Sequence, residues 1–304
     1  MSEGRVLITG AGGFVGGALA EGFEALGWRV TALDLAFVDN GPTGGASVDR
    51  VIADLSAGVP AHLPPVDVVV HAAAVTTEAA DLGWTRAAHV SANLRPLLAM
   101  LDYASRTPPR AFVFLSSTGV FASGDGSDAL ADTDEARGTS PYAAGKRAGE
   151  TLVPAALEGV TAAHVVRLGY IYGPHEQARP SRRRLSPVGQ WLAAARAGRP
   201  LEVRADDPRR DWTFAPDLAP AVARLVAGAA SPRPVHVGSP FVLTDSAMAA
   251  LITHHVPGVA SIVVPASGPM KPPMRPSDIP ALRGFPWTAP DAGIVRLAAA
   301  EVVA

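Results

Sequence analysis

Residues 5–16 read RVLITGAGGFVG, a short apolar run followed by a glycine-rich turn. The apolar run 5–9 is typical of a buried strand, and the residues after the turn favour a helix that continues to about Leu26. Glycines stand at 10, 13 and 16. The first permits a tight bend, the second lets a pyrophosphate approach the backbone, and the third packs helix on strand. The stretch therefore predicts a dinucleotide held at a helix N-terminus, beside the free N–H groups of Phe14 and Val15.

Further short apolar runs alternate with helix-like stretches through the first two-thirds of the chain. The expected strands are residues 29–33, 51–53, 67–71, 111–115 and 163–167. Continuous apolar strands separated by helices predict an α/β fold, a doubly wound parallel sheet buried on both faces.

The sequence changes character after Pro174, where proline and arginine become frequent. Helices are expected at 188–197 and 217–229, a short strand at 235–238, and irregular chain at 265–280. We therefore expect a dinucleotide-binding domain at residues 1–174. Residues 175–304 should form mainly a small C-terminal substrate-binding lobe, with some segments returning to the first domain.

Composition excludes several classes of function. The chain has 304 residues, 48% of them hydrophobic, and a net charge of −2, which argues against nucleic-acid binding through bulk charge. It has no cysteine, so disulfides and thiolate catalysis are excluded. No apolar run reaches about 18 residues and no signal peptide is evident, so we expect a cytoplasmic protein without a membrane span. His254 and His255 are adjacent and should point apart on a helix, so no metal site is expected.

Two aspartates follow expected strands. Asp34 lies 18 residues after Gly16, where a carboxylate accepts hydrogen bonds from the ribose hydroxyls of NAD and repels the 2′-phosphate of NADP. Asp54 has a position suited to the adenine amine. The alternative is that each of these side chains caps a turn. The pattern favours NAD as the cofactor.

Tyr142 and Lys146 stand four residues apart, so on a helix they share a face. Only Lys146 and Lys271 among the 26 basic residues are lysines. A phenol titrates near ~10, and an ammonium group close by lowers that pKa toward the range of a useful acid/base. The alternative is a buried tyrosine beside a surface lysine.

Taken together, these features resemble the extended short-chain dehydrogenase/reductase family, which includes sugar epimerases, dehydratases and ketoreductases. The resemblance rests on TGAGGFVG (9–16), Asp34, Asp54-Leu55, HAAA (71–74), Asn93, LSSTGVF (115–121), YAAGK (142–146), RLGYIYGP (167–174) and RRDWTFAPDLA (209–219). It implies a Rossmann fold, bound NAD and hydride transfer at an alcohol or ketone carbon.

The resemblance also implies roles for individual residues. Tyr142 becomes the acid/base, Lys146 keeps it poised and reaches the ribose, and Ser117 steadies the reacting oxygen. Thr118, which is also expected on the substrate side, is the alternative for this hydroxyl, Ser116 is a weaker one, and all three side chains could instead cap the strand end. Asn93 supports the active-site helix or serves as a buried structural residue. The cofactor is expected to touch Leu55, Ala72, Ala73 and Ala74. Thr118-Gly119 stand where sugar 4,6-dehydratases carry Asp-Glu, which disfavours elimination of water.

Arginines are concentrated in residues 175–210, which contain nine arginines and only four acidic residues. Arg210 matches a position that meets a phosphate in nucleotide-sugar members of the family, and Arg179, Arg182, Arg183 and Arg184 are expected to add to this anion site or to clamp a carboxylate. A solvated basic loop is the alternative. An anionic substrate is favoured, a nucleotide sugar before a sugar acid.

Three functions stay open at this point. One is a dehydrogenase or ketoreductase, including one that acts on a non-sugar carbonyl, and another is a nucleotide-sugar epimerase. The third is a regulatory protein that binds NAD without turnover, a class that typically lacks the tyrosine or the lysine. The resemblance further implies a homodimer. In it, the helix that contains Tyr142 and Lys146 and the helix before it, whose residues 94–104 have an apolar face, pair across a two-fold axis.

Overall fold

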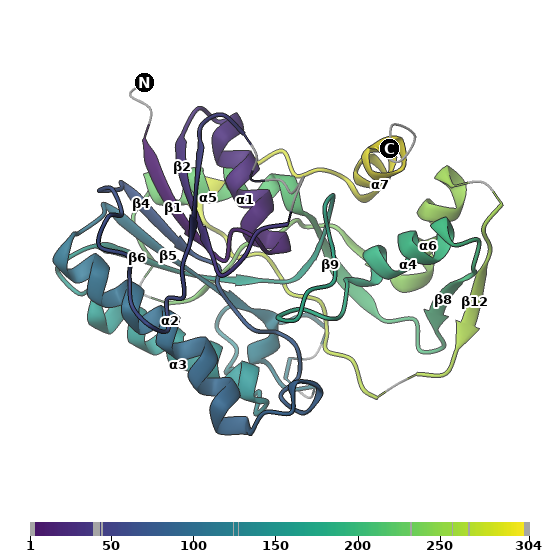
Figure 1. The fold of residues 1–304 in the computed structure, drawn as a ribbon. Coiled ribbons are helices and arrows are strands. Elements are labelled where there is room, and N and C mark those ends of the chain that lie inside the picture. The colour runs from purple at the N-terminus through teal and green to yellow at the C-terminus, as the bar shows by residue number, and fades with distance from the viewer. Residues whose placement is uncertain are drawn as a thin grey trace.

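A seven-stranded parallel sheet forms the body of the molecule (Figure 1). The computed structural model describes residues 4–38, 43, 45–123, 125–126, 128–231, 233–256, 258–266 and 268–300. The strand order is β10-β6-β5-β4-β1-β2-β3. The strands are β1 (Arg5–Thr9), β2 (Arg29–Asp34), β3 (Val48–Ile52), β4 (Val68–His71), β5 (Ala111–Ser117), β6 (Ala162–Leu168) and β10 (Val235–His236). The order in which the chain adds strands changes direction at β1, which lies between β2 and β4. Open sheets of this kind bind ligands at such a point.

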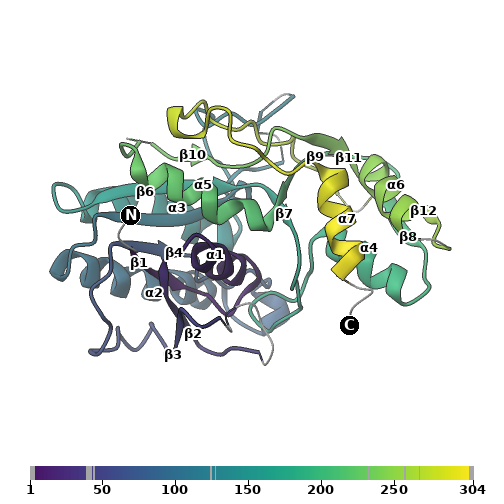
Figure 2. The ribbon, with the colours of Figure 1, turned by 90° about the horizontal axis from the view of Figure 1, so that it is seen from above.

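Helices cover both faces of this sheet, which confirms the doubly wound fold. On one face lie α1 (Phe14–Ala25) and α5 (Leu218–Ala227), side by side in Figure 2. The other face packs against α2 (Arg86–Arg106) and α3 (Pro141–Ala156). Side chains of β1 alternate between two cores: Val6 and Ile8 belong to the core under α1, and Leu7 to the core under α2. Burial on both sides explains why central strands such as β1 and β4 are largely apolar, whereas the edge strand β3 contains Asp49 and Arg50 and is mostly exposed.

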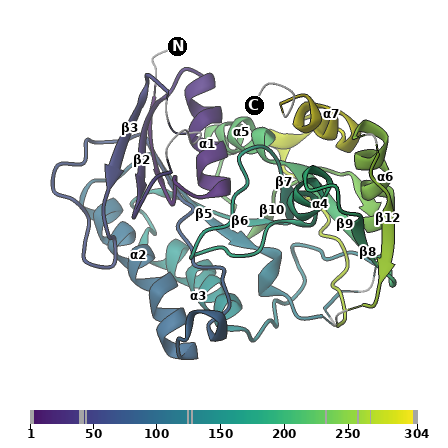
Figure 3. The ribbon, with the colours of Figure 1, turned by 45° about the vertical axis from the view of Figure 1, so that its right-hand side comes forward.

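A smaller lobe lies at one end of the sheet (Figure 3). It contains the three-stranded sheet β11-β9-β7 and the strand pair β12-β8. Its core is centred on Trp212, Trp191 and Tyr172. Its elements are β7 (Tyr170–Tyr172), α4 (Pro187–Arg196), β8 (Leu201–Arg204), β9 (Arg209–Phe214), β11 (Val242–Thr244), α6 (Asp245–His255), β12 (Ser261–Val264) and α7 (Pro290–Ala300). Short 3-10 turns complete the fold at Ala80–Leu82, Thr118–Val120, Ala215–Asp217 and Pro280–Leu282.

Two segments after residue 174 belong to the body of the molecule. Helix α5 packs against α1, so closely that a Cβ on Gly22 would lie 2.5 Å from the Cβ of Ala219. Strand β10 extends the main sheet by pairing with β6. Within the described ranges, no helix is both long and apolar enough to cross a bilayer, and no cluster of three or more histidine or acidic side chains is placed to hold a metal.

Candidate active site

The glycine-rich turn forms one wall of a cleft at the carboxyl end of the main sheet. Gly10 has a positive φ of 70°, and a Cβ there would lie 2.6 Å from the backbone nitrogen of Ala73. A Cβ on Gly16 would lie 2.1 Å from the carbonyl oxygen of Gly10. Neither position has room for a side chain. Helix α1 begins directly after Gly13 and carries no acid in its first turn, so its free N–H groups are available to an anion. This cradle fits a dinucleotide pyrophosphate.

Most of the residues expected around the cofactor line this one cleft. They are Gly10, Gly13, Phe14, Val15, Gly16, Asp34, Asp54, Leu55, Ala72, Ala73, Ala74, Tyr142 and Lys146. Ser117 lines it as well. Among the described residues, Asn93, Thr118, Arg183 and Arg210 lie outside this lining. The sequence did not indicate several other lining residues, among them Pro96, Ile171, Gln177 and Ser181, whereas Arg182, which was expected at an anion site, also lines the cleft.

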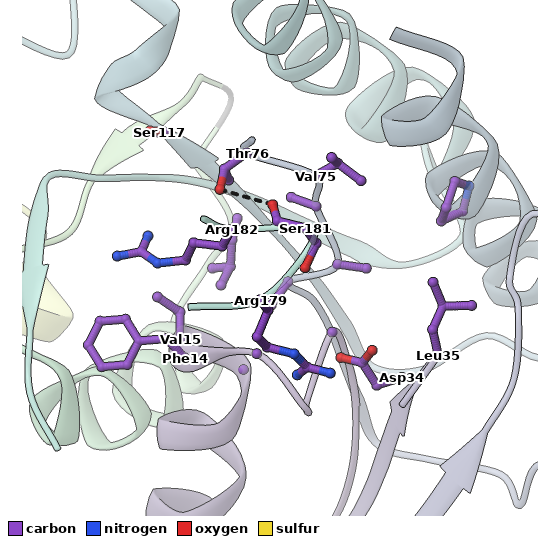
Figure 4. Close-up of a pocket in the computed structure, with 18 of the residues that line it drawn as sticks. Phe14, Val15, Asp34, Leu35, Val75, Thr76, Ser117, Arg179, Ser181 and Arg182 are labelled. Atoms are coloured by element: carbon purple, nitrogen blue, oxygen red, sulfur yellow. Dashed lines mark hydrogen bonds between the residues drawn. The ribbon is translucent and has the colours of Figure 1, made fainter. Parts of the chain in front are cut away.

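Asp34 ends β2 and faces the cleft beside Leu35 (Figure 4). Its Oδ2 accepts a hydrogen bond of 2.9 Å from the backbone N–H of Gly12, which ties the strand end to the glycine-rich turn. Asp54 lines the cleft and also closes a local turn, where it accepts bonds of 2.8 and 2.7 Å from the N–H and hydroxyl of Ser56. These bonds from Ser56 lower the pKa of the Asp54 carboxyl.

Tyr142 reaches the cleft from the first turn of α3. Ser140 caps this helix by accepting a 3.1 Å bond from the N–H of Ala143, and Pro141 occupies the first turn. The ring of Tyr142 packs so closely on Gly119 that a Cβ there would lie 2.8 Å from its Cε1. Burial raises the pKa of the Tyr142 phenol, while a hydrogen bond with Ser117 and the charge of Arg182 act in the opposite direction.

Lys146 lies one turn after Tyr142 and is buried, with 5% of its surface exposed. Its Nζ donates a 2.6 Å hydrogen bond to the carbonyl of Leu115 on β5. Burial lowers the pKa of Lys146 to about 8, and the charge of Glu150 opposes this shift. Ser117, at the end of the same strand, accepts a 3.0 Å bond from the N–H of Gly119. The strand end and the helix thus bring Ser117, Tyr142 and Lys146 to one place.

A buried ion pair supports this arrangement, and the sequence reasoning missed it. Glu150 accepts bonds of 2.8 Å from both Nε and Nη2 of Arg167 and a bond of 2.6 Å from the hydroxyl of Ser116. Glu150 stands four residues after Lys146 on α3, and this helical spacing was the available signal.

Asn93 holds the loop that follows β4. Its Oδ1 accepts a 3.0 Å bond from the N–H of Val75, and its Nδ2 donates bonds of 3.2 and 3.1 Å to the carbonyls of Val75 and His89. Val75 itself lines the cleft. The side chain of Asn93 therefore positions the cleft wall from behind.

The residues expected on the substrate side have different surroundings and do not form one site. Arg210 is buried and makes bonds of 2.5 and 2.8 Å to the carboxylate of Asp245. Arg183 is exposed and donates a 2.6 Å bond to the carbonyl of Asp81. Thr118 accepts a 3.0 Å bond at its carbonyl from Lys271. Of the expected arginines, Arg179 and Arg182 line the cleft, and Arg179 lies near Asp34 (Figure 4).

The model of the NAD dependent epimerase/dehydratase family matches residues 6–238. The chain belongs to this family. It is therefore an NAD-dependent enzyme, and the resemblance that the motifs indicated is confirmed.

Individual family relatives differ in their reactions. A dTDP-4-dehydro-6-deoxy-D-allose reductase from Streptomyces bikiniensis is 29% identical over 236 residues, which span 73% of this chain and 72% of the reductase. Two solved structures share the fold. One is an NAD-dependent NDP-hexosamine 5,6-dehydratase involved in tunicamycin biosynthesis, with a TM-score of 0.82, 22% identity and 99% of both chains covered. The other is a UDP-glucose 4-epimerase from Thermotoga maritima, with a TM-score of 0.80, 16% identity and coverage of 99% of this chain and 100% of that one.

Proposed function

We propose that this enzyme transfers a hydride at a secondary alcohol or ketone carbon of a nucleotide sugar, with Tyr142 as the acid/base. The observation that carries the proposal is that Tyr142, Ser117 and Lys146 line the same cleft as the glycine-rich turn and Asp34. A substrate carbon in this cleft therefore meets the proton-transfer group and the cofactor together. We infer a nucleotide sugar as the substrate because the similar reductase acts on a dTDP-sugar and the similar epimerase on UDP-glucose.

Each of the three side chains has a separate role in the proposed reaction. Bound NAD supplies the carbon that accepts or returns the hydride. Tyr142 takes the proton from the substrate hydroxyl during oxidation and returns it during reduction. The Ser117 hydroxyl hydrogen-bonds with the phenol and steadies the reacting oxygen as its charge changes. Lys146, fixed by its bond to Leu115, holds positive charge one helical turn away and is placed for the ribose of the cofactor.

We favour a reductase or an epimerase over a dehydratase. Elimination of water needs an additional acid and base beside the sugar ring. The resemblance puts that pair at Thr118 and Gly119, and Gly119 has no side chain. A Cβ at residue 119 would lie 2.8 Å from the Tyr142 ring, so any larger residue there would displace the tyrosine. Net reduction and epimerisation use the same three groups.

A substrate panel tests this proposal and separates these two reactions. Purified enzyme is incubated with UDP- and dTDP-sugars in the presence of NAD or NADH. Absorbance at the NADH band reports net oxidation or reduction, and proton NMR reports a change of configuration without net redox. We expect conversion of at least one nucleotide sugar. Turnover of neutral sugars or non-sugar ketones, with every nucleotide sugar left unchanged, would reject the substrate class.

A further inference from the structure

A short hairpin from the lobe side of the chain crosses the cofactor cleft. Arg179 and Arg182 exchange both backbone hydrogen bonds, each of 2.9 Å, around the two-residue turn Pro180-Ser181. Residues paired in this way place their side chains on the same face of a hairpin. Both arginines line the cleft (Figure 4). We call residues 179–182 the arginine hairpin.

The arginine hairpin is attached to both walls of the cleft. On one wall, the N–H groups of Thr76 and Thr77 donate bonds of 2.8 and 3.1 Å to the carbonyl of Ser181, and the Thr77 hydroxyl donates a 2.8 Å bond to the carbonyl of Pro180. On the opposite wall, the guanidinium of Arg179 donates to the carbonyls of Gly12 and Ala36, the latter at 2.7 Å. The hairpin therefore spans the cleft from the loop after β4 to the glycine-rich turn.

Arg179 lies at the end of the cleft where Asp34 is placed for the adenosine ribose. A Cβ on Gly12 would lie 2.8 Å from Nη1 of Arg179 and 3.1 Å from the carboxyl carbon of Asp34. The absence of a side chain at Gly12 thus lets a cation and an acid approach the same turn. This puts the Arg179 guanidinium at the Asp34 end of the cleft (Figure 4).

Arg182 lies over the start of α1, where the free N–H groups are. Its guanidinium carbon is 5.4 Å from the centre of the Phe14 ring. Nη2 donates to Glu176, which orients the side chain, while Nε is buried and finds no hydrogen-bond partner in the described part of the chain. A buried donor without a partner is costly, and a phosphate oxygen at the N-terminus of α1 would satisfy it.

We propose that Arg179 and Arg182 form a clamp on the cofactor, with Arg182 binding the pyrophosphate and Arg179 closing over the adenosine ribose. The charge balance agrees with this role. Glu176 offsets one of the two cations, and the dianionic pyrophosphate has more than enough negative charge to offset the other. NAD then enters or leaves only when the bonds of the arginine hairpin to one wall open. This inference goes beyond the proposed reaction and does not depend on the identity of the sugar.

Binding measurements without substrate test the clamp. Arg182→Gln, Arg179→Ala and Arg183→Ala are compared with the wild type by calorimetry at low salt, with NAD, ADP-ribose and adenosine as ligands. Arg183 is the matched control, because it directly follows the hairpin but is exposed and bonds to Asp81. We expect Arg182→Gln to weaken NAD and ADP-ribose by about tenfold or more, as the loss of a charged hydrogen bond does, and to leave adenosine unchanged. Arg179→Ala should speed NAD dissociation in a stopped-flow displacement experiment.

Two results would overturn the clamp. Wild-type affinity for ADP-ribose in both hairpin variants, together with a raised Michaelis constant for the sugar substrate, would make these arginines substrate ligands and overturn the clamp. Equal weakening in Arg183→Ala would trace the effect to general loosening of the segment and would also overturn it. Thermal melting of each variant verifies that it is folded. A failure of the proposed sugar chemistry would leave these binding results unaffected.

Discussion

Tyr142 occupies surroundings that oppose its ionisation. Burial raises the pKa of its phenol, and the groups that act against this are the Ser117 hydroxyl and the Arg182 guanidinium. The sequence indicated Lys146 for this task. In the structure its Nζ is 5.9 Å from the centre of the tyrosine ring and bonds to Leu115. Arg182 comes from the arginine hairpin, so spacing along α3 carries no information about it.

Removal of the phenol oxygen tests the role of Tyr142. Tyr142→Phe should lower kcat by ~10²–10⁴-fold, the usual contribution of a positioned acid/base. NAD affinity should stay close to that of the wild type, because the ring and Lys146 remain. Steady-state kinetics and calorimetry on the same preparation provide both values. A variant that keeps more than about a tenth of the wild-type rate would show that another group transfers the proton.

Asp34 provides a second prediction for a single side chain. Its carboxylate faces the cleft and is held by Gly12, so a 2′-phosphate at this place would meet a negative charge. We expect tighter binding of NAD than of NADP, and a smaller difference in Asp34→Ala. Dissociation constants for both dinucleotides measure this. Arg179 lies beside Asp34 and could bind the 2′-phosphate once the carboxylate is removed. The double variant Asp34→Ala/Arg179→Ala is therefore the control, because its affinity for NADP should be lower than that of Asp34→Ala. Equal or tighter NADP binding by the wild type would contradict the prediction.

At the scale of elements, the sequence predicted the main sheet better than the lobe. Strands β1, β4, β5 and β6 are buried on both faces, so each contains a short apolar run that is visible in the sequence, although His164 and Arg167 interrupt β6. The strands β7, β8, β9, β11 and β12 are three to six residues long, and several contain arginines, aspartates or exposed positions. Such strands form through pairing with distant partners, and their own composition does not reveal them.

A third prediction concerns helix α3, where Glu150 bonds to Ser116 on β5 and to Arg167 on β6. Glu150→Gln removes the negative charge that supports the Lys146 ammonium, so the pKa of Lys146 should fall below about 8. The alkaline limb of the kcat profile should then move to lower pH, if the ammonium form is the active one as we propose. The variant also leaves Arg167 buried without its partner, which should reduce the free energy of unfolding by ~3–5 kcal/mol.

The double variant Glu150→Gln/Arg167→Met separates these two effects. It removes the unpaired charge, so stability should recover in part while the alkaline limb stays displaced. A kcat profile in Glu150→Gln that coincides with that of the wild type would limit Glu150 to a structural role.

Helix α2 leads to a prediction about assembly. Leu98 lies on this helix with 49% of its surface exposed, next to the α2–α3 face that we expect to pair in a homodimer. Leu98→Glu should convert the dimer to a monomer in light scattering at micromolar concentration, because a buried unpaired carboxylate opposes association. Val263→Glu is the matched control, since Val263 is 74% exposed on β12, away from this face. A wild-type monomer under these conditions would refute the expected dimer.

At the scale of the whole molecule, local motifs predicted the cofactor half of the site and long-range pairing determined the rest. The glycine-rich turn, Asp34 and the Tyr142–Lys146 spacing are contained in short segments. The anion site expected from nine arginines depended on which partners the fold supplies. Arg210 meets Asp245, which comes from 35 residues further along the chain, and Arg182 meets Glu176. The number of charged residues along the sequence does not predict which of them form pairs in the fold.

Buried histidines distributed over the main sheet control how stability responds to acid. Burial lowers the pKa of His71 to about 3 and that of His236 to about 4, and it also lowers the pKa of His164. His71 and His236 are neutral in the folded chain near pH 5.5, and His164 is harder to protonate there than in the unfolded chain, where each imidazole binds a proton once the pH falls below about 6.5. The unfolded state therefore binds more protons, and stability decreases as the pH falls through this window.

Asp211 acts in the opposite direction over a narrower range. Burial raises its pKa to about 6 from 3.8, so below pH 6 the folded state holds a proton that the unfolded state lacks. At pH 5.5, His71 and His236 leave about two more protons on the unfolded chain and Asp211 leaves nearly one more on the folded chain. The net excess is therefore about one proton, or ~1–1.5 kcal/mol per pH unit, and His164 adds to it in the same direction. Urea unfolding at pH 7.5, 6.5 and 5.5 measures this slope. His71→Gln removes one of the three histidines and should flatten it by about one proton, whereas Asp211→Asn should steepen it. A free energy of unfolding that is constant from pH 7.5 to 5.5 would mean that these histidines take up protons while the chain is folded.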